Sequence, residues 1–343
     1  MGKLISVCLI LFCLSGCYLL KQGRGQLDLR LNQVSLEEAI VQESNPEYRH
    51  LFEQIPRIKS FAETRLLLRK SENYTGYYRT TQRGVTFVVT ASPKTKLKAY
   101  TWWFPILGSV PYKGYFNQKE AEALALELQE QGYDTWVFAA PTYSTLGWFK
   151  DPVTTPMMRR GHYYLASTII HEMTHETLFV QDEVSFNEQL ASFVGRQGAL
   201  LYFKEVHRFS QKQLDALMEN VRKSGRFAET VRRYLPRFQN VYNIQQPESS
   251  KLEQRKKLFS DLSREISQLY PNLPEDRKKF NNARLLQYRR YTPDSPVIRK
   301  MWLESNNDWK RFWDLVRAYV DDIKGEEIEG KKRVAGVVEN NID

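Results

Sequence analysis

The chain has 343 residues, of which 42% are hydrophobic and 26% charged, and its formal net charge is +10. This length allows one large domain or two ordinary ones, with a hydrophobic core that needs no disulfides. Basic residues are interspersed with acidic ones, as in Lys251–Lys257, which indicates a mixed solvated surface with weak attraction to anionic lipid or cell wall, and no nucleic-acid partner.

Residues 1–17 have the features of a secretory signal. Lys3 gives a positive start, Leu4–Leu14 is apolar, and small residues precede Cys17. The ending Leu14-Ser15-Gly16-Cys17 resembles a bacterial lipobox, in which the cysteine is lipidated and becomes the mature N-terminus. We therefore expect a lipoprotein signal peptide over 1–17, a lipid on Cys17 and a short tether over 18–26.

Two alternatives for this segment stay open. It could be an uncleaved anchor helix, although it is short for a membrane span. Met1–Ser6 also fits the myristoylation pattern. Under the lipoprotein interpretation, Tyr18 follows the cysteine where Asp often signals inner-membrane retention, so we expect a cell-envelope protein, lipid-anchored to the outer membrane and facing the periplasm. All three cysteines lie within 1–17, so the rest of the chain can form no disulfide and offers no thiolate to a metal.

The next part of the chain mixes helices with a few strands. Helical spacing of apolar residues runs from Leu36 to about Arg69, and we expect Pro46 and Pro56 to divide it into two or three helices. The other predicted elements are a turn at Asn73–Gly76, a strand pair at Val85–Ala91 and Ala99–Phe104, a helix at Gln118–Gln131 and a strand at Thr135–Ala140. From about Ala199 onward almost everything is predicted to be helical.

One motif carries recognisable chemistry. His171-Glu172-Met173-Thr174-His175 follows an H-E-x-x-H pattern, on a segment with helical spacing. Residues four apart share one helix face, so both imidazoles can bind one zinc ion. Glu172 can then act as general base towards a water on that metal, whose pKa zinc lowers towards about 7.

A third protein ligand should lie nearby, because a catalytic zinc has three protein ligands and one open position. Val180–Phe186 is long enough to reverse the chain, and a helix starting near Ser185 would place Glu188 opposite the histidines. Ala191 and Ser192 would allow the two helices to approach closely. In the competing interpretation Glu188 only completes a capping box with Ser185, and Asp182 or Glu183 binds the metal.

The two segments together resemble a known group. His171–His175 followed by Asn187-Glu188-Gln189-Leu190-Ala191 is similar to the gluzincins, metallopeptidases with two histidines and a helical glutamate as ligands. More closely, the chain resembles a bacterial family of predicted aminopeptidases, many of them predicted lipoproteins. The further segments that carry this resemblance are Trp103–Pro105, Tyr112–Phe116, Tyr143–Pro152 and Asn281–Leu285.

The predicted elements make an α+β fold that is predominantly helical, with a small β-sheet and a helical C-terminal region, and the resemblance implies a gluzincin-like metal helix pair. We assign residues 27–198 to a metallopeptidase region and 199–343 to the helical region. The implied activity is aminopeptidase action on peptides, with specificity for free N-termini resting on the resemblance alone. A non-enzymatic zinc-stabilised lipoprotein, and a zinc amide hydrolase acting on cell-wall peptides, remain alternatives. The sequence leaves the oligomeric state open.

Several roles around the metal are less defined. Tyr143 is our candidate donor to the oxyanion, with simple aromatic packing as the alternative. Ser192 stands where thermolysin-like gluzincins carry an Asp that orients a histidine, so another acceptor is needed. An aminopeptidase must also hold a protonated α-amino group, for which Glu176, Asp182 and Glu183 are the nearest acidic residues. The segment from Trp103 to Phe116 is either a substrate-facing loop or a core turn. We expect the remaining histidines to be surface or packing residues: His50, His162 and His207.

Overall fold

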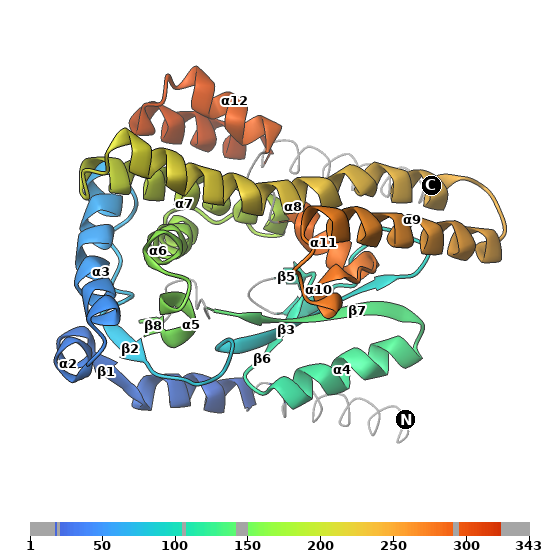
Figure 1. Ribbon diagram of the computed structural model, residues 1–343, viewed down its shortest axis with the longest axis horizontal. Helices are drawn as coiled ribbons and strands as arrows, with labels where there is room; N and C mark the ends of the chain where they lie inside the picture. Colours follow the sequence, from blue (N-terminus) through green and yellow to red (C-terminus); the bar gives the residue numbers. More distant parts are fainter. Residues whose placement is uncertain (1–17, 19–20, 105–107, 142–149, 291–294, 324–343) are drawn as a thin grey trace, which may run out of the picture.

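The computed structural model describes residue 18 and residues 21–104, 108–141, 150–290 and 295–323. It is an α+β fold dominated by helices, as the sequence predicts (Figure 1). The helices are α2 (Leu36–Gln42), α3 (Pro46–Arg65), α4 (Gln118–Glu130), α5 (Thr155–Met158), α6 (His162–Thr177), α7 (Val184–Glu205), α8 (Gln211–Asn243), α9 (Glu248–Leu269), α10 (Glu275–Lys278), α11 (Asn282–Arg290) and α12 (Pro296–Glu304). Residues 21–31 and 309–323 are also helical.

The strands form three small sheets. Their bounds are β1 (Gln33–Ser35), β2 (Gly76–Tyr78), β3 (Thr86–Pro93), β4 (Trp102–Phe104), β5 (Gly108–Val110), β6 (Lys113–Tyr115), β7 (Tyr133–Ala140) and β8 (Val153–Thr154). The sheet orders are β1-β2-β8, β6-β3-β7 and β4-β5. In the second sheet β3 is central and pairs antiparallel with both neighbours. Helix α4 packs against this sheet, and α11 also contacts β3 and β7 (Figure 1).

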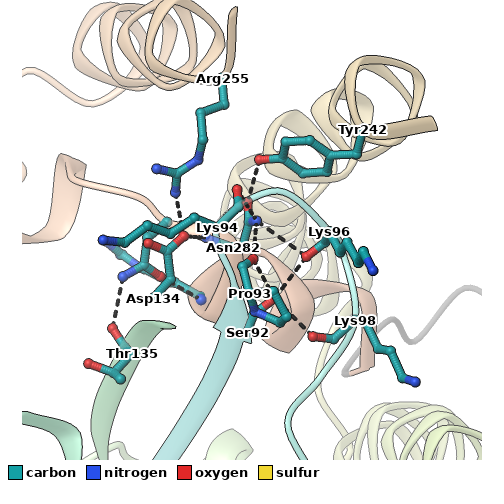
Figure 2. A network of polar contacts seen from close by, with 12 residues as sticks. Ser92, Pro93, Lys94, Lys96, Lys98, Asp134, Thr135, Tyr242, Arg255 and Asn282 are labelled. Atoms are coloured by element: carbon teal, nitrogen blue, oxygen red, sulfur yellow. Dashed lines mark hydrogen bonds and ion pairs between the residues drawn. The ribbon is translucent and has the colours of Figure 1, made fainter. Parts of the chain in front are cut away.

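The predicted pairing of Val85–Ala91 with Ala99–Phe104 is wrong. Strand β3 pairs instead with β6 and β7, and β4 pairs with β5. After β3 the chain forms a loop, because the Ser92 hydroxyl donates to the carbonyls of Lys96 and Lys98 at 3.1 and 2.9 Å (Figure 2). Of the predicted ladder only one bond is present, from Tyr100 N to Ala91 O at 2.9 Å.

We expected Pro56 to interrupt the helix, but it does not. Helix α3 begins at Pro46, as a proline in the first turn favours, and continues past Pro56 to Arg65. An internal proline costs about 3 kcal/mol or more. Apolar residues on both sides of it are buried in the main core, including Phe52, Ile55 and Ile58. Tertiary packing therefore outweighs the local preference.

The part of the predicted tether that the structure describes, residue 18 and residues 21–26, does not form an extended linker. Residues 21–31 are helical, and they begin on the surface of the second sheet. The Tyr18 hydroxyl and the Gln22 amide each donate to the carbonyl of Gly114 at 3.0 Å, and Lys21 pairs with Glu120 at 2.7 Å. The start of the described chain is thus bound to β6 and α4. Among the described residues, no helix is both long and apolar enough to cross a membrane.

Helix α11 is fixed by a buried polar network at its N-terminus (Figure 2). The Asn282 amide group donates to the carbonyl of Pro93 at 2.8 Å, and its oxygen accepts from the Tyr242 hydroxyl at 2.8 Å. Its backbone N–H donates to Asp134, which also pairs with Arg255. Because these partners lie on β3, β7, α8 and α9, α11 is held in one position between the sheet and the C-terminal helices.

Candidate metal centre

The site is built on α6 and α7, whose apolar residues anchor them in the main core. Leu165, Ile169 and Ile170 of α6 are completely buried. His171 and His175 follow on this rigid helix, one turn apart. Helix α7 packs against α6, and later residues of α7 lie beside earlier residues of α6, as expected for a chain that reverses between them.

Close contact between the two helices depends on Gly195, three positions beyond the pair Ala191 and Ser192 that the sequence suggested. A Cβ atom at Gly195 would lie 2.6 Å from the Ser167 carbonyl oxygen and 3.2 Å from the Cβ of His171. Such an approach is possible only for a residue without a side chain. Ala191 is also completely buried, whereas Ser192 is half-buried.

The loop between the helices leaves Glu188 available to the histidines. The Asn187 amide group accepts from Val180 N at 2.9 Å and donates to Val180 O at 2.7 Å, which closes the loop. Helix α7 has Glu183 as its N-cap and no side-chain cap, so the Ser185 capping box does not form. Asp182 accepts from Ser109 N at 3.3 Å, on β5. Neither rival carboxylate joins the histidine cluster.

Three donor atoms converge between the helices. The Nε2 atoms of His171 and His175 are 3.2 Å apart, and they lie 3.4 and 3.8 Å from Oε2 of Glu188. All three ligand atoms lie within 4.8 Å of one another, and the structure gathers no other metal-binding group of this kind among the residues it describes. His175 and Glu188 are only 8% and 9% exposed.

Burial and charge set the protonation of this cluster. Burial disfavours the charged form of Glu188, but a hydrogen bond with His171 and the nearby imidazoles outweigh it, so its pKa is lowered. Burial alone would lower the pKa of His171, yet Glu188 and Glu172 raise it. The pKa of His175 is lowered by burial and by the charge on His171.

The donor set fits a zinc ion. Ligands at about 2.0–2.2 Å in tetrahedral geometry are separated by roughly 3.4 Å, close to the three observed distances. Two imidazole nitrogens that face each other need either a proton or a cation between them. Among the described residues, Nδ1 of His175 is buried and has no hydrogen-bond partner, so the acceptor that would orient this histidine stays unidentified.

Glu172 lies in the same helix turn and is 8% exposed. Two tyrosines, the buried Tyr74 and the half-buried Tyr112, have their pKa raised, mainly by desolvation and in part by the Glu172 charge. For Tyr112 the Glu188 charge contributes more than the Glu172 charge. Both hydroxyls therefore lie in the electrostatic environment of the predicted base. Tyr143, the predicted oxyanion donor, lies outside the described residues, as does Cys17.

Glu176 is occupied by other contacts. It accepts hydrogen bonds from the Ser71 hydroxyl at 2.9 Å and the Asn73 amide at 2.8 Å. Burial nevertheless raises its pKa. It is therefore neither the freely solvated charge nor the unoccupied amine acceptor that the sequence allowed.

Sequence reasoning missed two residues in the electrostatic environment of Glu188. Tyr112 precedes β6, and the guanidinium carbon of Arg290 lies 5.5 Å from the centre of its ring. The charge on Arg290 also helps to lower the pKa of Glu188. The segment from Trp103 to Phe116 thus brings a side chain to the metal centre. The only sequence signal was that Tyr112 belongs to a segment shared with the resembling family.

The other three histidines come together at the opposite end of α6. The ring of His162 lies 5.0 Å from that of His50 and 6.4 Å from that of His207, and the latter two are 6.3 Å apart. Burial and the neighbouring imidazoles lower the pKa of His162 and of His207. They pack together, as expected of packing residues, but no pattern in the sequence indicates that they meet.

These features define a class: a largely helical α+β protein in which two histidines and a glutamate from two packed helices form one buried cluster beside a second glutamate. The chain belongs to the family described as "Putative aminopeptidase", whose model matches residues 17–329. Comparison with curated proteins and with solved structures returned no match.

Proposed function

We propose that the protein is a zinc-dependent aminopeptidase, in which His171, His175 and Glu188 hold the metal. The observation that carries this proposal is the approach of their three donor atoms to separations of 3.2, 3.4 and 3.8 Å. Membership in the family supports the peptidase assignment. When bound, zinc would polarise the substrate carbonyl and make hydroxide available near neutral pH.

Glu172 is the proposed general base. It follows the first ligand on the same helix, and a purely structural metal site would have no use for a buried carboxylate there. Its carboxylate would take a proton from the attacking water and return it to the leaving amine. Tyr112 and Tyr74 are protonated near neutral pH, since the ordinary tyrosine pKa near 10 is raised further in both, so each can donate a hydrogen bond to a developing oxyanion. Tyr143 remains a third candidate donor.

The substitution Glu172→Gln tests this function. It keeps the size of the side chain and removes the base, so zinc content should stay at about one per chain while peptide hydrolysis falls by roughly 10²–10⁴-fold or more. Metal analysis and turnover of peptides with free and acetylated N-termini are the measurements. Unchanged turnover in this variant would contradict the mechanism, and internal cleavage of the acetylated peptide would contradict aminopeptidase action.

We further propose that Cys17 is lipidated and holds the protein on the outer membrane, facing the periplasm. The lipobox-like Leu14–Cys17 ending and Tyr18 after it support this location. Cys17→Ala should leave the protein unprocessed or free of the membrane fraction. Recovery of the wild-type protein in the cytosol would rule the proposal out.

A further inference from the structure

Helix α11 brings a buried cation to the metal centre. Its N-terminus is fixed by the Asn282 network, and the helix contacts α7, which carries Glu188. Arg290 is the last residue of α11 and is only 5% exposed. Because the helix is fixed at its N-terminus and Arg290 is buried, the fold positions the guanidinium away from solvent.

The guanidinium of Arg290 has a donor that is not used by the residues that the structure describes. Its Nη1 is buried without a hydrogen bond, and no carboxylate of the described chain lies within ion-pair distance of it, although its charge lowers the pKa of Glu188. Its guanidinium carbon lies 5.5 Å from the centre of the Tyr112 ring. A buried unpaired guanidinium is costly and is normally matched by an anion.

Another arginine on the same helix shows what a structural role looks like. The guanidinium of Arg284 donates to the carbonyls of Lys279 and Arg277, and it lies 4.4 Å from the centres of two aromatic rings. Arg284 therefore satisfies its donors within the protein. Arg290 does not, although it is equally buried. The contrast indicates that Arg290 serves a group that comes from outside the chain.

The charge balance at the centre points to a negative group. The carboxylates of Glu172 and Glu188 would balance one divalent cation, and Arg290 would then remain as a surplus positive charge. Guanidinium binds carboxylate in a two-pronged geometry that lysine cannot reproduce. In a peptide whose N-terminal residue is removed, the anionic end is the C-terminal carboxylate.

We infer that Arg290, steadied by the ring of Tyr112, binds the C-terminal carboxylate of the substrate, so that the enzyme acts on short peptides. This inference rests on the proposed peptidase function. Each residue of an extended chain spans at most about 3.3–3.6 Å, so a guanidinium close to the metal ligands can reach the carboxylate only when few residues follow the scissile bond. The free amino end would point to the other side of the metal.

The test uses alanine peptides of two to five residues, each with a free C-terminal carboxylate and as the C-terminal amide. For the zinc-loaded wild-type protein we expect kcat/KM to favour the free acid by about tenfold or more, as for loss of a charge-assisted hydrogen bond, and to fall for longer peptides. Arg290→Gln should reduce the ratio of acid to amide to about one, and Arg290→Lys should restore it only in part. Arg289→Gln, one residue away and exposed, is the matched control and should keep the ratio.

Equal turnover of acid and amide by the wild-type protein would overturn the inference, as would a preserved ratio in Arg290→Gln. A binding measurement distinguishes failure of this inference from failure of the peptidase proposal. Calorimetry with zinc-loaded Glu172→Gln should show tighter binding of trialanine than of trialanine amide, and the added Arg290→Gln change should abolish the difference. If neither peptide is hydrolysed but this difference is present, the inference stands and the peptidase proposal fails.

Discussion

Helix α6 carries a histidine cluster at each end, and the two clusters differ in their neighbours. At the C-terminal end, His171 and His175 face the carboxylate of Glu188. At the N-terminal end, His162 meets the rings of His50 and His207, and the nearest carboxylate contact is between His50 and Glu53 at 3.7 Å. Proximity of imidazoles alone therefore does not define a metal centre.

The two clusters differ in whether any imidazole is favoured as a cation. Glu188 and Glu172 raise the pKa of His171 against the effect of burial, while burial and the charge on His171 lower that of His175, so one positive charge is favoured among these residues. Burial and neighbouring imidazoles lower the pKa of both His162 and His207, so a cation is disfavoured there. A buried acidic ligand makes the difference. The comparison can be tested by changing one cluster at a time.

The largest effect should come from removing a single imidazole. His175→Ala should reduce the zinc content from about one ion per chain to nearly none, because the two remaining protein ligands are too few to hold the ion. His207→Ala, the matched change in the other cluster, should leave the zinc content unaltered. Metal analysis of the dialysed proteins measures both. Equal zinc loss in the two variants would mean that the clusters are not distinct.

A smaller effect should follow from separating α6 and α7. Gly195→Ala places a Cβ atom 2.6 Å from the Ser167 carbonyl oxygen, so the helices must shift next to His171. We expect a loss of about 1–3 kcal/mol in the free energy of unfolding and weaker zinc binding.

Gly225→Ala on α8 is the control, since a Cβ atom there meets nothing within 4 Å. It should instead be neutral or stabilise the protein by up to about 1 kcal/mol. Thermal unfolding and zinc titration of the two variants measure the contrast. A Gly195→Ala protein that matches the wild type would show that the helices tolerate the shift.

The smallest effect should be on the pH dependence of stability. The pKa values of His162 and His207 are lowered on folding, so the unfolded chain binds more protons as the pH falls through the ordinary histidine range near 6.5. Their contribution to stability is thus complete above this range and is lost as the pH falls towards the lower folded-state pKa values. Glu47 opposes the shift for His162, and Arg57 adds to it for His207.

His207→Gln should therefore make the unfolding temperature fall less between about pH 7.5 and pH 5.5 than it does in the wild type. Both proteins keep the same metal ligands, so proton-driven zinc release contributes equally and cancels in the comparison. A steeper fall in the variant would reverse the sign assigned to this cluster.

The parts of the centre that the sequence predicted depend on local geometry. Helical spacing brings His171 and His175 to one face, and a short reversal brings Glu188 opposite to them. All three ligands lie within one stretch of 18 residues, His171–Glu188, so local geometry is enough to predict that they meet. Arg290 could not be found in this way, because its position depends on the Asn282 contacts to the distant strands β3 and β7.

The wrong strand pairing has the same origin. The β-branched and aromatic residues in Ala99–Phe104 correctly indicate extended backbone at Trp102–Phe104, but they do not specify a partner. The partner is decided by side chains such as Ser92, whose hydroxyl bonds hold the following loop away from a hairpin. Local pattern predicts the type of element, and long-range polar contacts decide its neighbours.

The docking of Tyr18 on Gly114 would limit how the protein moves at a lipid surface. The Tyr18 ring also lies beneath the ammonium group of Lys113, at 4.1 Å, so the residue next to Cys17 is fixed on the folded body. If Cys17 carries a lipid, no flexible linker separates the bilayer from the folded body, and the side of the protein formed by β6 and α4 must face the lipid headgroups. The protein would then keep a fixed orientation relative to the membrane. Without a flexible tether, it would act only on peptides that diffuse to the membrane surface.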